Sequence, residues 1–156
     1  MYQYPEENRF PNRKYPRIKG YDYSQNNFYF ITICTDQKKC IFGKVNSLNK
    51  FGEIVEKALK KIEEHFSGIR IDKYVIMPNH IHVIVEIAGK GSNLINAVGS
   101  FKSAVTKKIH ETDPELKVWQ RSFYDHVIRN QKSYEKIWNY IETNPIKWEE
   151  DCFYQQ

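Results

Sequence analysis

The sequence predicts an α+β fold, in which an antiparallel sheet carries helices and the elements follow the order β-α-β-β-α-β-α. Three observations lead to this class. Short β-branched and aromatic segments alternate with segments of helical periodicity. Residues 69–77 and 81–87 are separated only by a tight turn and should pair as a hairpin. The chain has 156 residues, of which 40% are hydrophobic, enough for one domain with its own core.

The first strand is predicted at residues 27–35, NFYFITICT, because aromatic and β-branched side chains favour a half-buried strand. Residues 40–42 form either a short extension or a second short strand. The clearest amphipathic helix follows at residues 51–66, and Gly68 stands where a helix C-terminus favours glycine. Its apolar residues recur at helical spacing: Phe51, Ile54, Val55, Ala58, Leu59, Ile62 and Phe66.

The hairpin of residues 69–77 and 81–87 turns at Pro78-Asn79, and Gly89 and Gly91 break the chain after it. A second helical stripe then spans residues 94–109, with lysines on its other side. Residues 117–128 are less regular but aromatic, and most of them are predicted to form the fourth strand. A helix at residues 132–143 ends at Asn144, because the residue before a proline is pushed out of the α region. This order is that of a split βαβ arrangement.

Positive charge is concentrated at the N-terminus. The chain has 24 Lys and Arg against 19 Asp and Glu, and residues 1–20 contain three of the six prolines. Such a segment cannot be a helix or a central strand. We predict a basic arm at residues 1–20 and a single domain at residues 21–156; a merely solubilising tail is an equal alternative. The basic residues of the arm are Arg9, Arg13, Lys14, Arg17 and Lys19.

Composition excludes several classes of protein. No apolar run approaches the roughly 20 residues of a membrane span, and the first residues lack an apolar secretory stretch. Three cysteines, Cys34, Cys40 and Cys152, without a C-x-x-C pair argue against a disulfide scaffold or a zinc ribbon. We therefore expect a cytoplasmic protein with no membrane association. A pI near 9.0 favours a polyanionic partner.

Two histidines carry the sharpest chemical signal. In Pro78-Asn79-His80-Ile81-His82, the histidines lie two residues apart on a strand and share one face. The opposite face, from Ile81 to Ile87, is uniformly apolar and should receive the two amphipathic helices. Two imidazoles at this spacing can bind one divalent ion. The alternative is a pair of polar residues on a half-exposed strand.

A metal site needs at least one further ligand. The candidates are Glu86, His65, His110, His126 and side chains of the last helix. In that helix Tyr140 and Asn144 lie one turn apart on one face. A tyrosine beside a metal-bound phosphate could act as a covalent nucleophile, and an amide oxygen one turn on could ligate the ion. The alternative is that both belong to the inward stripe of the helix.

Three motifs in order, V-I-M-P-N-H-I-H-V-I-V, V-W-Q-R-S-F-Y-D-H-V-I-R and N-Y-I-E-T-N-P, resemble the REP-associated tyrosine transposases. The segment G-Y-D-Y-S, which precedes the first predicted strand, is also typical of these transposases. These enzymes form a branch of the single-tyrosine HUH endonucleases, together with insertion-sequence transposases. The resemblance covers about residues 19–147.

The resemblance implies a ferredoxin-like core and a metal-dependent enzyme. His80 and His82 would be the histidines of the HUH motif and Tyr140 the nucleophile. Asn144 stands where related insertion-sequence enzymes carry a glutamine that completes the metal site. The implied cofactor is Mg²⁺ or Mn²⁺. The implied activity is cutting single-stranded DNA beside hairpins, at REP-like or insertion-sequence ends, leaving a 5′-phosphotyrosine and a free 3′-hydroxyl without ATP.

Tyrosine has a pKa near 10, so the nucleophile must lose its proton to a base, to water or with metal assistance. Asp125 and His126 qualify as the base by chemistry only, and a structural role on the fourth strand is expected for both. Trp119 and Phe123 are expected in the core. DNA contacts are predicted for the arm cations and, behind them, for Lys102, Lys107, Lys108, Arg121 and Arg129.

Two other functions remain open at this point. One is a non-catalytic hairpin or single-stranded nucleic-acid-binding protein on a ferredoxin-like fold, which would need neither Tyr140 nor a metal. The other is a metal-dependent hydrolase without a covalent step. The sequence leaves open whether the protein is a monomer or a homodimer, which hairpin it recognises, and whether it serves transposition or a domesticated role.

Overall fold

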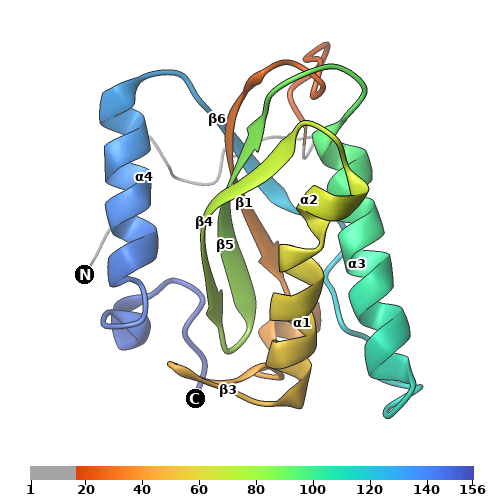
Figure 1. The fold of residues 1–156 in the computed structure, drawn as a ribbon. Coiled ribbons are helices and arrows are strands. Elements are labelled where there is room, and N and C mark those ends of the chain that lie inside the picture. Colours follow the sequence, from red (N-terminus) through yellow and green to blue (C-terminus); the bar gives the residue numbers. More distant parts are fainter. Residues whose placement is uncertain (1–16) are drawn as a thin grey trace.

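The predicted fold class is confirmed in a computed structural model, which describes residues 17–156. Its centre is a four-stranded sheet in the order β4-β5-β1-β6, with every neighbouring pair antiparallel (Figure 1). The first strand thus lies between the third and the last strands of this sheet, as a split βαβ arrangement requires. The strands are β1 (Asn27–Cys34), β4 (Ile69–Met77), β5 (His80–Ile87) and β6 (Tyr124–Ile128).

Helices cover both faces of this sheet, but unequally. Figure 1 shows α1, α2 and α3 on one side and α4 alone on the other. A small hairpin, β2 (Gly43–Lys44) with β3 (Ser47–Leu48), precedes α1. The helices are α1 (Lys50–Lys60), α2 (Ile62–His65), α3 (Leu94–His110) and α4 (Gln131–Thr143), and a short 3-10 helix, Trp148–Glu150, follows α4.

Asparagine begins each of the three long helices. The side chain of Asn49 accepts from the backbone N–H groups of the first turn of α1, Asn93 does so for α3 and Asn130 for α4. These side chains satisfy donors that a helix start leaves without a partner. The helix predicted at residues 51–66 is interrupted at Lys61, so that α1 and α2 are separate.

The alternation along β5 divides the interior into two cores. Ile81, Val83 and Val85 face α1 and α3 and join the larger apolar core. Ile84 faces α4 and joins a smaller core with Ile137 and other α4 residues. Full burial of an aliphatic side chain contributes roughly 1.5–3 kcal/mol, so the α1–α3 face provides most of the apolar stabilisation. The predicted apolar face therefore receives the two amphipathic helices, as expected.

Two strand predictions are wrong. Residues 40–42 form no strand, because their chain leads into the β2–β3 hairpin. The fourth strand begins only at Tyr124, and residues 117–123 contribute a single bridge between Trp119 and Thr35. The chain leaves the sheet here because Ser122 adopts a left-handed conformation, with φ 68°.

Of the predicted basic arm at residues 1–20, the structure describes residues 17–20. Arg9, Arg13 and Lys14 lie outside the described residues. Arg17 and Ile18 contact the domain: Ile18 packs against the larger core, and its backbone N–H donates to the Tyr23 hydroxyl. The boundary at residue 20 stays a prediction.

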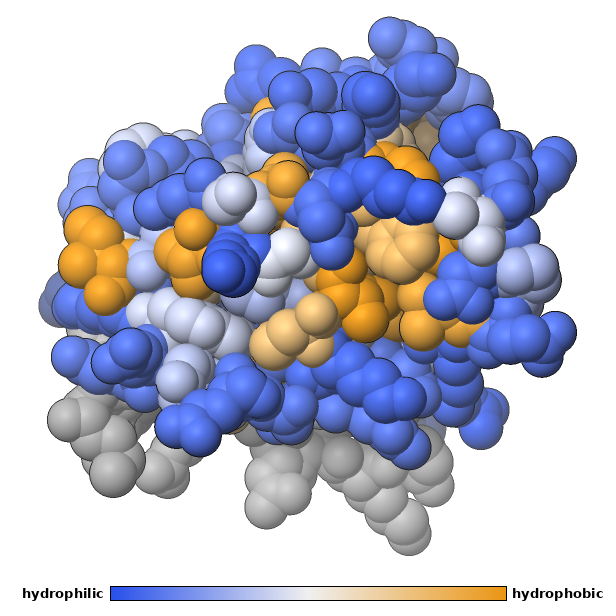
Figure 2. All heavy atoms as spheres, turned by 90° about the horizontal axis from the view of Figure 1, so that it is seen from below, coloured by the Kyte–Doolittle hydropathy of each residue, from blue (hydrophilic) through white to orange (hydrophobic). Residues whose placement is uncertain are grey.

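The surface is mainly hydrophilic. Figure 2, seen from below Figure 1, shows apolar side chains gathered right of the centre, on the side of α1 and α3. In the part of the chain that the structure describes, no helix is long and apolar enough to cross a membrane.

Candidate active site

Strand β5 places His80 and His82 side by side on the face covered by α4. Both side chains are fully buried, and their ring centroids are 4.5 Å apart. His82 Nδ1 lies 2.7 Å from the Thr32 hydroxyl of the neighbouring strand β1. His80 Nδ1 lies 2.8 Å from the side-chain oxygen of Asn79 in the hairpin turn. A partner at Nδ1 fixes each ring and directs Nε2 into the site.

The Asn79 contact also sets the protonation of His80. The amide nitrogen of Asn79 donates to the backbone carbonyls of Lys38 and Phe153, which identifies its Oδ1 as the atom facing His80. Since that oxygen only accepts, His80 carries its hydrogen on Nδ1, and Nε2 of the neutral ring offers a lone pair. Within residues 17–156, this Nε2 has no hydrogen-bond partner.

Burial keeps both imidazoles neutral at physiological pH. It lowers the pKa of His80 to about 4, against a smaller opposing effect of the Asp151 charge and the Asn144 side chain. Burial, together with the neighbouring His80, lowers the pKa of His82 well below its ordinary value. Neutral imidazole is the form that binds a metal ion.

Helix α4 brings Tyr140 to the histidines. The Tyr140 hydroxyl lies 3.2 Å from His82 Nε2, and its ring packs edge-on against Phe30 of β1. The rival tyrosine, Tyr134, faces elsewhere and donates to the Asp72 carboxylate at 2.5 Å. The structure therefore separates two tyrosines of one helix that spacing could not rank.

Asn144 lies one turn beyond Tyr140, and its side chain is buried beside the histidines. Its amide nitrogen donates to Asp151 at 2.5 Å, while its Oδ1 has no partner among the described residues. Ligand atoms of His80, His82 and Asp151 all lie within 4.8 Å of one another. The site thus joins two imidazole nitrogens, an amide oxygen and a carboxylate.

Asp151 and its neighbour Phe153 are the parts of the site that sequence reasoning missed. They follow α4 in an irregular segment with no periodicity and no recognisable spacing to the histidines. The Phe153 ring lies 4.5 Å from the His80 ring, centroid to centroid, and covers the histidine face. Asn79 holds this segment in place by donating to the Phe153 carbonyl at 2.8 Å.

The other predicted ligands lie elsewhere. His65 bonds the Lys61 carbonyl, and His110 bonds the Leu116 carbonyl. Glu86 pairs with Arg70 at 2.5 Å near the far end of β5. His126 pairs with Phe30 in the sheet and is not part of the cluster.

Asp125 lies on the opposite face of the sheet. It faces Ile31 in the register of the larger core and binds Arg17 at 2.7 Å and the Tyr23 hydroxyl at 2.8 Å. Its carboxylate is therefore a structural partner for Arg17 and is too remote to deprotonate Tyr140. Trp119 and Phe123 are buried in the larger core, as expected.

Two of the cations that were predicted to contact DNA instead bind groups of the protein itself. The Lys102 ammonium donates to the carbonyls of Gln120 and Ser122. Arg17 donates to the Phe123 carbonyl and to Asp125, and its guanidinium stacks on the Phe123 ring at 3.6 Å. Among the other predicted contacts, those that the structure describes are exposed: Lys19, Lys107, Lys108, Arg121 and Arg129.

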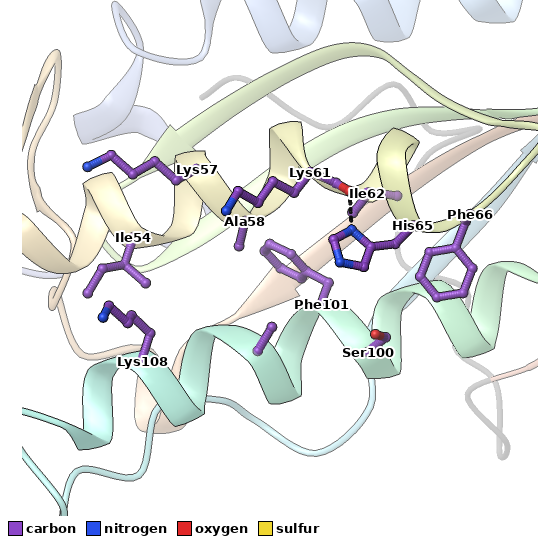
Figure 3. A pocket seen from close by; sticks show the side chains of 11 residues that line it. Ile54, Lys57, Ala58, Lys61, Ile62, His65, Phe66, Ser100, Phe101 and Lys108 are labelled. Atoms are coloured by element: carbon purple, nitrogen blue, oxygen red, sulfur yellow. Dashed lines mark hydrogen bonds between the residues drawn. The ribbon is translucent and has the colours of Figure 1, made fainter.

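A hollow of about 420 Å³ also lies on the opposite side of the molecule, between α1, α2 and α3 (Figure 3). Its lining is mainly apolar, with the Lys57, Lys61 and Lys108 side chains around it. His65, which also lines it, is tied to the Lys61 carbonyl. The histidine–tyrosine cluster is on the other face of the sheet, so this hollow is separate from the candidate site.

The cluster joins two imidazole nitrogens, an amide oxygen and a carboxylate oxygen, a mixed set of donors that can hold a divalent metal ion. The two buried acceptor atoms, on His80 and Asn144, have no other partner among the described residues. Buried polar atoms without partners are costly, and a cation between them would satisfy both. The residues present therefore fit a metal ion.

A split βαβ sheet with paired histidines facing a tyrosine of the last long helix defines a class of candidate nucleophilic enzymes. The family comparison then identifies the lineage. The model of the family described as "Transposase IS200 like" matches residues 22–144. This chain belongs to that family.

This chain is also similar to individual proteins. An uncharacterized protein of Haemophilus influenzae is 37% identical over 168 aligned positions, covering 92% of this chain and 93% of that protein. A REP-associated tyrosine transposase of Escherichia coli is 29% identical over 77 residues, 49% of this chain and 44% of that protein. A solved structure described as a REP-associated tyrosine transposase bound to a REP hairpin has the same fold, with a TM-score of 0.68. It is 20% identical, and the match covers 84% of this chain and 73% of that one.

Proposed function

We propose that this protein is a metal-dependent endonuclease and strand transferase for single-stranded DNA at hairpins, and that it acts through a covalent phosphotyrosine. The observation that carries the proposal is the position of the Tyr140 hydroxyl, 3.2 Å from His82 Nε2 within one chain. This position puts the phenolic oxygen beside a nitrogen that would hold the ion, where a nucleophile for a metal-bound phosphate would lie. Membership of a transposase family supports the same reaction class.

His80, His82 and Asn144 would hold Mg²⁺ or Mn²⁺, with Asp151 as an additional oxygen donor. When bound, the ion supplies Lewis-acid polarisation of the scissile phosphate. Thr32 and Asn79 hold the two rings with Nε2 toward the ion through their contacts at Nδ1. The neutrality of both histidines at pH 7 means that no proton has to leave before a metal binds.

Tyr140 performs the covalent step. Its phenolic oxygen bonds to phosphorus, the bond between phosphorus and the 3′ oxygen breaks, and a 5′-phosphotyrosine and a 3′-hydroxyl result. The phenolic proton passes to solvent, and the departing 3′ oxygen gains one. Because one phosphodiester is exchanged for another, the bond energy is retained and strands can be rejoined without ATP.

DNA hairpins are the proposed substrate. The solved relative with this fold is described as bound to a REP hairpin, and the Escherichia coli relative is named for REP elements. The exposed cations Lys19, Arg121 and Arg129 would contact the DNA. Arg9, Arg13 and Lys14 of the predicted arm would add to them.

A non-catalytic hairpin-binding protein is the competing function. What favours it is the complete burial of His80 and His82 beneath Phe153, which leaves no open path to the phosphate in this arrangement. Such a protein would bind the same DNA but would form no bond to it.

A covalent-adduct assay separates the two functions. Hairpins with single-stranded flanks are first enriched from a randomised pool by binding to the Tyr140→Phe protein, then incubated with wild type and Mn²⁺. We expect a protein–DNA adduct that survives denaturation, needs Mn²⁺ and carries the DNA on Tyr140 by peptide mass. Binding without any adduct would establish the non-catalytic function instead.

A further inference from the structure

A hollow of about 390 Å³ lies at the end of β1 and the start of β6, lined by Cys34 and residues 120–124. Its position follows from the sheet register. Cys34 faces His80 across the β1–β5 pair, and Tyr124 faces Thr32 across the β1–β6 pair. Residues directly opposite in an antiparallel pair project to the same face, so the hollow borders the face that carries the histidines.

One row of side chains connects the hollow to the candidate active site. Tyr124, Thr32 and His82 follow one another on β6, β1 and β5. Adjacent strands are about 4.8 Å apart, so Tyr124 lies about 10 Å from the His82 position. A nucleotide next to a phosphate held at the histidines would reach this hollow.

The wall of the hollow is held rigidly by two cations. Lys102 donates to the carbonyls of Gln120 and Ser122, and Arg17 donates to the Phe123 carbonyl and the Ser122 hydroxyl. The left-handed Ser122 turns the loop away from the sheet. A loop fixed in this way loses little conformational entropy when a ligand binds.

The lining has the chemistry of a nucleobase site. Tyr124 is 42% exposed, although tyrosine is an aromatic residue that usually packs inside. Aromatic faces of this kind stack on unpaired bases. Arg121 and Gln120 also line the hollow, and each carries two or more N–H donors. Arginine pairs with the O6 and N7 atoms of guanine, and glutamine with the N6 and N7 atoms of adenine.

We propose that this hollow, the base pocket, binds one unpaired purine of the DNA strand adjacent to the scissile phosphate, stacked on Tyr124 and read by Arg121 and Gln120. The proposal rests on the proposed function, because it needs single-stranded DNA at the histidines. It assigns Arg17 and Lys102 to shaping the base pocket and not to binding phosphates.

Site-specific fluorescence tests the stacking. The Tyr140→Phe protein, which cannot cut, is titrated with hairpins selected on it that carry 2-aminopurine at successive flanking positions. We expect one position whose fluorescence is quenched on binding. Tyr124→Ala in this background should abolish that quenching and weaken binding about tenfold, whereas Tyr124→Phe should retain both, because only the ring is needed.

Arg121 and Arg129 form a matched pair for the reading of the base. Both are exposed arginines that flank β6, Arg121 before the strand and Arg129 directly after it, and each alanine variant removes one positive charge. We expect wild type to prefer a purine over a pyrimidine at the quenched position by about tenfold. Arg121→Ala should reduce this preference to nearly one, while Arg129→Ala should weaken both DNAs equally.

The outcomes are distinguishable from those of the proposed function. If the protein binds hairpins and forms the adduct, but no position shows quenching that depends on Tyr124, the base pocket is refuted and the proposed function stands. Equal loss of purine preference in Arg121→Ala and Arg129→Ala would also refute it. If no hairpin binds at all, both proposals are wrong.

Discussion

The two faces of the sheet differ in what they bury. The face under α1 and α3 is almost entirely apolar, with β5 contributing Ile81, Val83, Val85 and Ile87. The face under α4 buries a cluster of polar side chains surrounded by apolar ones. His80 and His82 of the same strand lie at the centre of the polar cluster. One strand thus serves stability on one side and candidate chemistry on the other.

This difference shows how little stability the α4 face needs to provide. The larger core already fixes the sheet, so the smaller one can carry buried polar atoms without partners, such as His80 Nε2 and Asn144 Oδ1. Each such atom costs free energy. Among the described residues they cluster at the candidate site, which is where function, and not folding, would retain them.

The largest effect is expected for Tyr140→Phe. It removes only the hydroxyl from the α4 face, so cleavage and adduct formation should fall by at least about 10³-fold. Hairpin affinity should stay within about twofold, and the free energy of unfolding should drop by no more than about 1 kcal/mol for the lost hydrogen bond. Adduct yields on denaturing gels measure this; an adduct that persists would point to Tyr134 or Tyr124.

Adjacent residues of β5 test the division between the faces directly. Ile81→Ala should lower the free energy of unfolding by about 2–5 kcal/mol while leaving Mn²⁺ affinity nearly unchanged. His80→Ala and His82→Ala should stay folded but lose Mn²⁺ affinity by at least about 100-fold, and Asn144→Ala should have an equal or weaker effect. Titration calorimetry and urea unfolding give both quantities. Unaltered Mn²⁺ affinity in the double histidine variant would remove the metal site.

Asp125 is the charged exception on the apolar face, and Arg17 neutralises it. Arg17→Ala should lower the free energy of unfolding by about 3–5 kcal/mol, because it leaves a buried carboxylate without its cation. Lys19→Ala, which removes an exposed cation two residues on, should change it by less than about 0.5 kcal/mol. Urea denaturation compares the two. Equal stabilities would mean that solvent reaches Asp125.

Lowering the pH should reduce the stability of the protein through the buried histidines of the α4 face. Between pH 6.5 and about 4 the unfolded chain takes up a proton at His80 that the folded protein refuses. The free energy of unfolding should therefore fall as pH decreases through this window, by about 3 kcal/mol from His80, with His82 acting in the same direction. Urea unfolding with EDTA at successive pH values measures the fall. His80→Gln should reduce it, whereas His65→Gln, at an exposed position, should not; equal slopes in all three would contradict the assignment.

The smallest expected effect is on the salt dependence of DNA binding, and it tests which face of the sheet the DNA approaches. If DNA reaches the α4 side near β6, Arg129→Ala should flatten the dependence of log affinity on log salt by about 0.7–0.9, one phosphate contact. Lys107→Ala, an exposed cation on α3, should leave this slope unchanged. Salt titrations of hairpin binding compare the two variants. A flatter slope only in Lys107→Ala would place the DNA over α1 and α3.

Much of the architecture was predictable because it is encoded locally. Alternation along β5 placed the histidines and the apolar residues on opposite faces, and the helical stripes assigned α1 and α3 to the apolar side. Tyr140 and Asn144 were placed on one face of α4 by their spacing of four residues. The motifs also indicated the family that the comparison then matched over residues 22–144.

Predictions failed where local pattern gave no information. The aromatic residues 117–123 suggested a strand, but Lys102 and Arg17 bind the backbone carbonyls of residues 120, 122 and 123, and the segment makes a single bridge at the end of β1. Those two cations were assigned to DNA because a sequence reports charge and not the partner that charge meets. The sequence does not distinguish a lysine or arginine that binds groups inside the fold from one that is exposed on the surface.

The sequence by itself determined which side chains share a face, because strand and helix periods are properties of the local backbone. Only the tertiary structure decided which of the tyrosines meets His82, that Asp151 and Phe153 close the site, and that Arg17 neutralises Asp125. These contacts join residues 58, 71, 73 and 108 positions apart in the chain. They depend on how two cores pack around one sheet, which no local repeat encodes.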